Sequence, residues 1–97
     1  MVALSAEALR RIDAAWREVH ALAALAELAG MLDPNGTRGR WAVAGELAAR
    51  LRRFDGAAYA RISQGYRAPH DRIEALMMAV LRASLPTSRR RLFDLLD

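Results

Sequence analysis

Residues 5–36 read SAEALRRIDAAWREVHALAALAELAGMLDPNG, and this stretch decides the fold. Ser5 is suited to cap a helix, and Glu7 stands in the first turn, where the helix dipole favours a carboxylate. Apolar residues then recur at steps of three and four. The run Asp33-Pro34-Asn35-Gly36 interrupts this pattern, because Pro, Asn and Gly favour a turn. We therefore expect a helix from Ser5 to about Met31, followed by a loop.

This first helix carries two apolar stripes. The first comprises Leu9, Ile12, Trp16 and Val19, and the second follows His20. A helix that is apolar over a wide arc usually contacts more than one neighbour, so it is either central to the fold or part of a dimer interface. The candidate residues for self-association are Trp16, Leu22, Leu25, Leu28 and Leu32.

Shorter helices are expected after the loop. The spacing predicts a second helix over 40–53, with Trp41, Ala44, Leu47, Leu51 and Phe54 along one face. Asp55 is expected to cap a short third helix that stops at Gly65, and Pro69 to begin a fourth that reaches Ser84. Thr87 or Ser88 is expected to cap the last helix. No strand alternation is visible, so the prediction is an all-α single domain over 1–97. It is a small bundle of four to five helices, an N-terminal αα-hairpin followed by shorter helices.

The charge is distributed unevenly along the chain. All fifteen basic residues other than histidine are arginines, and the formal net charge is +4. Residues 37–97 carry twelve of these arginines against six carboxylate residues, whereas residues 1–36 carry three against five. This asymmetry favours a polyanionic or acidic partner for the second part of the chain.

Catalytic and metal-binding patterns are sparse. The chain has no cysteine, which excludes disulfides and thiolate zinc sites. His70 and Glu74 are four residues apart, but two ligands do not make a metal site, and His20 suits a structural role. No nucleophile signature and no phosphate-binding glycine loop is present. We therefore expect a protein that is not an enzyme, with no cofactor, no metal and no small-molecule substrate.

The N-terminus has no basic start followed by an apolar block, as a signal peptide would have. The longest apolar run, Ala21–Ala26, is far shorter than the ~20 residues of a membrane span. The expected location is therefore the cytoplasm of a bacterium, with no membrane partner. The use of Arg wherever Lys would serve reflects either GC-rich coding bias or selection for phosphate binding.

Residues 46–69 read ELAARLRRFDGAAYARISQGYRAP and resemble the helix-turn-helix core of the lambda-repressor-like family. The first helix of that motif is matched by Glu46, Leu47, Ala48 and Leu51, and its turn by Phe54 and Asp55. The recognition helix and its exit are matched by Tyr59, Ile62, Gly65, Arg67 and Pro69. The resemblance implies a DNA-binding regulator, although Tyr59, Ile62 and Tyr66 also fit a plain helical core.

Two hypotheses for function follow. The first is a helical protein-interaction or regulatory module that self-associates, most simply as a dimer, or binds a partner protein. The alternative is a DNA-binding transcriptional regulator with a divergent helix-turn-helix. The candidate contacts to nucleic acid or an acidic partner are Arg50, Arg52, Arg53, Arg61, Gln64, Arg67 and Arg72.

Overall fold

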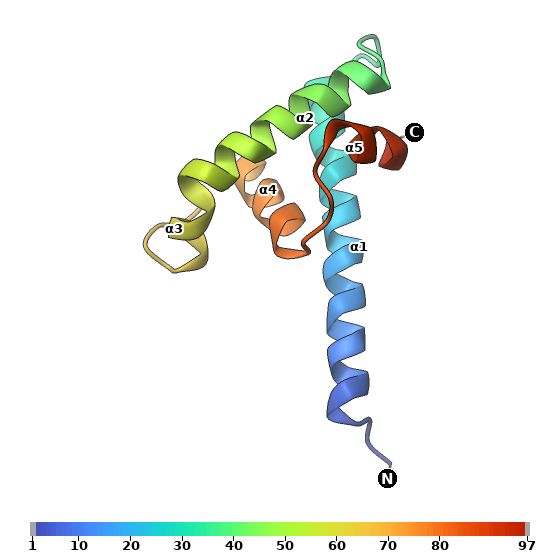
Figure 1. Ribbon diagram of the computed structural model, residues 1–97, viewed down its shortest axis with the longest axis vertical. Helices are drawn as coiled ribbons and strands as arrows, with labels where there is room; N and C mark the ends of the chain where they lie inside the picture. Colours follow the sequence, from blue (N-terminus) through green and yellow to red (C-terminus); the bar gives the residue numbers. More distant parts are fainter. Residues whose placement is uncertain (1, 97) are drawn as a thin grey trace.

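The computed structural model describes residues 2–96, which form helices and no strands, as expected for an all-α protein. The elements in chain order are α1 (Ala6–Leu32), α2 (Arg40–Phe54), the π-helical segment η1 (Asp55–Tyr59), α3 (Ala60–Ser63), α4 (Arg72–Arg82) and α5 (Arg89–Leu95). Figure 1 shows their arrangement: α1 is long and straight, and the other helices gather beside its C-terminal half.

Helix α1 begins and ends where the sequence predicted. The Ser5 hydroxyl accepts a hydrogen bond from the Ala8 N–H at 3.1 Å, as an N-cap does. Beyond Leu32, the Asp33 carboxylate accepts hydrogen bonds from the N–H groups of Thr37 (2.9 Å) and Arg38 (3.2 Å). These bonds order the loop that leads into α2.

The two helices of the predicted αα-hairpin form an open V. Helices α1 and α2 lie close together next to their connecting loop and diverge from there (Figure 1). Helix α4 packs along the C-terminal half of α1, and α5 packs on α2. The last helix therefore packs on its own chain, with Leu92 fully buried.

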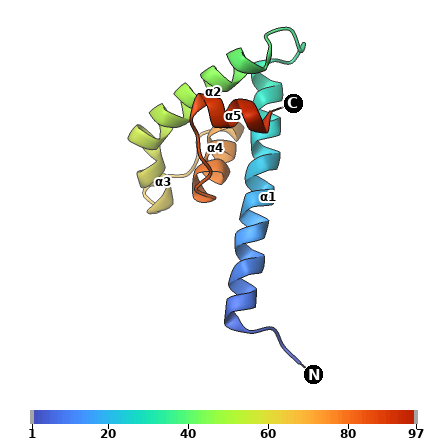
Figure 2. The ribbon, with the colours of Figure 1, turned by 45° about the vertical axis from the view of Figure 1, so that its right-hand side comes forward.

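The predicted start of the third helix was wrong. Asp55 has helical backbone angles (φ −58°, ψ −43°) and continues the helix rather than capping a new one. The chain stays helical from Arg40 to Ser63, and it changes direction at η1 instead of passing through a tight turn (Figure 2). A π segment accommodates an extra residue within a helix. Phe54, Ala58 and Ile62, four apart, are consequently all buried.

The predicted stop at Gly65 is confirmed. Gly65 has φ +82°, its N–H donates to the Ile62 carbonyl, and the Tyr66 N–H donates to the Arg61 carbonyl. This is a Schellman motif, which favours glycine at the left-handed position. The fourth helix starts later than predicted, because Asp71 rather than the Pro69 region caps α4, accepting the Glu74 N–H at 2.9 Å.

One core joins all the helices. Its fully buried large side chains come from α1, α2, α4 and α5, and they are Leu25, Leu47, Leu51, Met78, Val80 and Leu92. Ala21 and Ala24 are also buried on α1, where their small side chains allow α4 to approach closely. Within residues 2–96, no helix combines the length and the apolar character that crossing a membrane would require.

Candidate interaction surface

The N-terminal half of α1 projects away from the rest of the protein, as both ribbon views show (Figures 1 and 2). Residues 9–20 are all exposed to solvent. They include four large apolar side chains on one helical face, which together we call the α1 ridge: Leu9 (55% exposed), Ile12 (44%), Trp16 (58%) and Val19 (53%). Contiguous exposed apolar surface of this kind is typical of interaction sites.

The residues predicted for self-association separate into two groups. Trp16 and Leu22 are exposed, as the prediction requires. Leu25 and Leu28, each 2% exposed, lie in the core, so for these two the prediction was wrong, and Leu32 is partly buried against the same core. The physical reason is that the second stripe of α1 faces α4 within the same chain.

The α1 ridge continues in smaller side chains. Ala23, Ala26 and Gly30 follow Val19 at the same steps of four, three and four, and all three are exposed. Two hollows border them. One, of about 520 Å³, lies between α1 and the end of α5 and is lined by Leu22, Leu25, Ala26, Ala29, Leu95 and Leu96.

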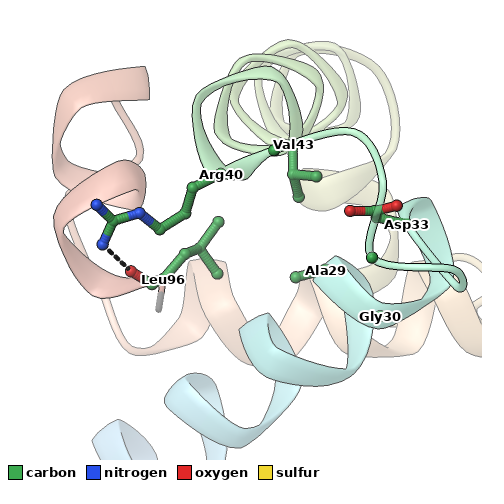
Figure 3. Close-up of a pocket in the computed structure, with 8 residues that line it drawn as sticks. Ala29, Gly30, Asp33, Arg40, Val43 and Leu96 are labelled. Carbon is green, nitrogen blue, oxygen red and sulfur yellow. Dashed lines mark hydrogen bonds between the residues drawn. The ribbon is translucent and has the colours of Figure 1, made fainter.

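The second hollow lies at the loop end of α1 and has a volume of about 460 Å³ (Figure 3). Ala29 and Gly30 line it from α1, and Arg40 and Val43 line it from α2. The Arg40 guanidinium donates to the Leu96 carbonyl at 2.9 Å and so holds Leu96 as one wall of this hollow. Ala29 and Leu96 line both hollows, which therefore adjoin.

The arginines predicted to contact a polyanion form two groups, those with an ion-pair partner in the described chain and those without one. Arg50 pairs with Glu46 (2.9 Å), Arg67 with Glu74 (2.9 Å) and Arg72 with Glu27 (2.8 Å), so their charges are engaged within the chain. The other three arginines are exposed and have no ion-pair partner within the described part of the chain. These are Arg52, Arg53 and Arg61. Gln64 is also exposed, just beyond α3.

The Glu74 carboxylate accepts hydrogen bonds from both a side chain and the backbone. The Arg67 guanidinium donates to both of its oxygens, at 2.9 and 3.2 Å, and the His70 backbone N–H donates at 2.8 Å. These bonds, the one from Arg67 foremost, lower the pKa of Glu74 from 4.5 to about 2. The contact holds the segment before α4 against its first turn, which gives Arg67 a structural role.

The Arg67–Glu74 contact predicts a pH dependence of stability. A carboxylate whose pKa falls on folding stabilises the protein above its unfolded pKa, and this is lost as pH drops from about 4.5 towards 2. Glu74→Gln should lower the free energy of unfolding by about 2 kcal/mol at pH 7. The difference from wild type should shrink as pH falls below about 4.5 and vanish only below about pH 2 in urea titrations. Glu18→Gln, at an exposed position on α1, is the control and should change little; a pH-independent deficit in Glu74→Gln would contradict the assignment.

A stack of arginines and aromatic rings joins α5 to α2, and the sequence reading missed it. The Arg89 guanidinium lies 4.1 Å from the centre of the Trp41 ring, and the Arg40 guanidinium lies 4.2 Å from that of Phe93. The two rings meet edge to face at 5.4 Å. A Cβ at Gly45 would lie 2.8 Å from the Arg89 guanidinium, so this glycine makes room for the stack. A glycine inside a helix is the signal that could have pointed to it.

The histidines add no site. His70 lies 3.9 Å from Glu74 through Nδ1, and His20 lies beside Trp16 with their ring centres 5.8 Å apart. Over residues 2–96, no three His, Asp or Glu side chains are grouped closely enough to hold a metal ion.

Comparison of this chain with protein-family models, with curated proteins and with solved structures finds no match, and the resemblance of residues 46–69 to a helix-turn-helix therefore stays a prediction.

Proposed function

We propose that this protein is a helical interaction module that self-associates through the exposed face of α1. The observation that carries the proposal is the α1 ridge, four large apolar side chains that are 44–58% exposed on the half of α1 that projects from the rest of the described chain. The N-terminal half of α1 projects into solvent with an apolar face, which leaves that face available to a second helix.

The composition of the surface supports binding rather than chemistry. Its side chains are apolar, and the hollows beside it are lined mainly by Leu, Ala and Gly. Such surfaces recognise apolar helix faces, as helix-in-groove partners do. A regulatory role would follow if self-association and binding of a different partner compete for the same face.

Sedimentation equilibrium of the wild-type chain tests the proposal. The apparent mass should rise from that of one chain to that of two between about 1 and 100 μM, the affinity range expected of an interface of modest area. In a Trp41→Phe background, Trp16 fluorescence should shift to the blue over the same range as its ring leaves water. A strict monomer across the whole range would remove the proposal.

A second candidate function is binding to DNA. It is favoured by the exposed side chains of Arg52, Arg53 and Arg61, for which the described residues supply no carboxylate partner, and by the net charge of +4. These arginines lie on α2 and α3, within the segment that resembles a helix-turn-helix. Contacts of this kind bind phosphates with little dependence on sequence.

DNA binding predicts a steep salt dependence. Affinity for a random-sequence labelled duplex, measured by fluorescence anisotropy, should fall at least tenfold between about 50 and 200 mM salt. Replacing Arg52, Arg53 and Arg61 by Ala should reduce the slope of log K against log salt by about 2.7. Arg10→Ala on α1 is the matched control for a lost exposed charge. No binding at about 50 mM salt would exclude this function.

A further inference from the structure

We infer that the α1 helices of two copies pair antiparallel, so that the α1 ridge of each lies on the small residues in the C-terminal half of the other. This rests on the self-association proposed above and adds its direction, its register and the site that each copy offers. The site is the surface formed by Ala23, Ala26, Gly30 and the two adjoining hollows, and its ligand is the N-terminal half of α1 from a second copy.

The spacing of the exposed residues fits a helix–helix seam. From Leu9 to Gly30, seven exposed residues follow one another at alternating steps of three and four. This alternation keeps them on one face along the helix and is the pattern by which two helices pack side by side. The core residues Ala21 and Leu28 lie on the other side, towards α4, so the seam is free of the packing within the chain.

The sizes of the side chains favour the antiparallel direction. With the two-fold axis beside residue 21, Val19 lies opposite Ala23, Trp16 opposite Ala26 and Ile12 opposite Gly30. Every layer then combines one large and one small residue, which keeps the helix separation constant at the usual 8–10 Å. A parallel pair would place Trp16 against Trp16 and Gly30 against Gly30, and the separation would have to change along the seam.

Gly30 is explained by this pairing and not by its own chain. A Cβ added there would meet no atom within 4 Å, so nothing in the protomer requires a glycine. Glycine is disfavoured inside a helix, and a close approach by another segment is one reason for its presence there. The layer with Ile12 of the second copy supplies such an approach.

The hollows beside the small residues complete the site. Leu95, which is 47% exposed, and Leu96 form the far wall of the groove along Ala26 and Ala29. Continuing the antiparallel register by one turn brings Leu9 of the second copy to the hollow at the loop end of α1 (Figure 3). The ridge therefore meets two hollows rather than a bare helix, one lined by apolar side chains and the other also by Asp33 and Arg40.

The charges beside the seam are compatible with this register. It places Asp13 of one copy near Glu27 of the other, which alone would be unfavourable. The Arg72 guanidinium already lies on Glu27, at 2.8 Å, and is 66% exposed, so it neutralises that carboxylate and is open to a second one.

The area is sufficient for a reversible dimer. Helix α1 is about 40 Å long and about 11 Å across. Covering some 40% of its lateral surface buries about 550 Å² per copy, or about 1,100 Å² in total. That is near the lower limit for stable interfaces.

A size swap tests the register. Gly30→Leu should fill the hole that receives Ile12 and weaken the dimer at least tenfold by sedimentation. The circular dichroism spectrum of this variant should match that of wild type, because a Cβ at position 30 meets no atom of its own chain. Ile12→Ala should also weaken the dimer. The double variant Ile12→Ala/Gly30→Leu restores one large and one small residue per layer, and should associate more tightly than either single variant. If the double variant is instead the weakest, the register is wrong.

The direction is measured independently with one spin label. The chain has no cysteine, so Ala6→Cys provides a single exposed labelling point at the start of α1. Antiparallel pairing about residue 21 predicts a distance of about 45 Å between the two labels, whereas a parallel pair predicts less than about 25 Å. A short distance would overturn the antiparallel inference and leave the proposed self-association standing. A monomeric wild type would overturn both.

Discussion

Ile12→Glu is expected to weaken self-association by at least about 100-fold without unfolding the chain. Ile12 is 44% exposed in the single chain and lies in the middle of the α1 ridge, so the protomer does not depend on its burial. A dimer contains the residue twice. Each copy would lose the burial of an apolar side chain and would place a carboxylate against apolar residues, which together exceed about 2.7 kcal/mol.

Ala14→Glu is the matched control for this experiment. Ala14 is exposed, lies two residues further along α1 and points to the opposite side of the helix from the α1 ridge. The same charge is therefore introduced at nearly the same place without touching the ridge. Sedimentation should find a dissociated Ile12→Glu variant and an Ala14→Glu variant close to wild type. Equal effects of the two variants would show that net charge, and not the ridge, governs association.

The two ends of α1 and the start of α5 could be predicted from the sequence, because local chemistry determines them. Ser5 caps α1 through its own hydroxyl, and Asp33 orders the following loop with its own carboxylate. Ser88 caps α5 in the same way. In each case a short polar side chain accepts a hydrogen bond from a backbone N–H group three or four residues away. The local sequence is therefore enough to predict the helix end.

The continuation of α2 through Asp55 could not be predicted in this way. Asp followed by Gly is typical of a helix start or turn, yet Phe54, Ala58 and Ile62 are all buried on the same continuous helix. Burial of these residues against the core outweighs the local preference, and the π segment adjusts their alignment. Tertiary packing of this kind is not visible in residue spacing.

Whether an arginine is paired within the chain also depends on residues that are distant in the sequence. Arg72 pairs with Glu27, forty-five residues away, and Arg89 stacks on Trp41 across two helices. A charge count places twelve arginines in the second part of the chain but does not say which ones the chain itself neutralises. The basic surface open to a polyanion is therefore smaller than the composition indicates.

Periodicity likewise shows which residues share a face of α1 but not what covers that face. The two stripes of α1 are similar in sequence, and the fold treats them differently: α4 covers Leu25 and Leu28, whereas the α1 ridge stays exposed. The difference arises because α4, with 11 residues, is shorter than the 27-residue α1 and reaches only part of it.

Leu25→Ala is expected to lower the free energy of unfolding by about 2–5 kcal/mol, because it leaves a cavity in the core. Leu25 is 2% exposed, whereas Leu22, three residues earlier on the same helix, is 38% exposed. Leu22→Ala removes the same atoms from a partly solvated site and should cost the single chain less than about 1 kcal/mol. Both variants should be compared by urea unfolding at concentrations below the dimer range.

This pair of variants distinguishes residues of the second α1 stripe that stabilise the fold from those that stabilise the dimer. A chain of this size is stable by only about 5–15 kcal/mol, so Leu25→Ala should move the unfolding midpoint strongly. Leu22 lines the groove that receives the second copy, so Leu22→Ala should instead weaken the dimer. If Leu25→Ala left unfolding unchanged and only dissociated the dimer, Leu25 would belong to the interface after all, and the division of α1 into a core side and a partner side would be wrong.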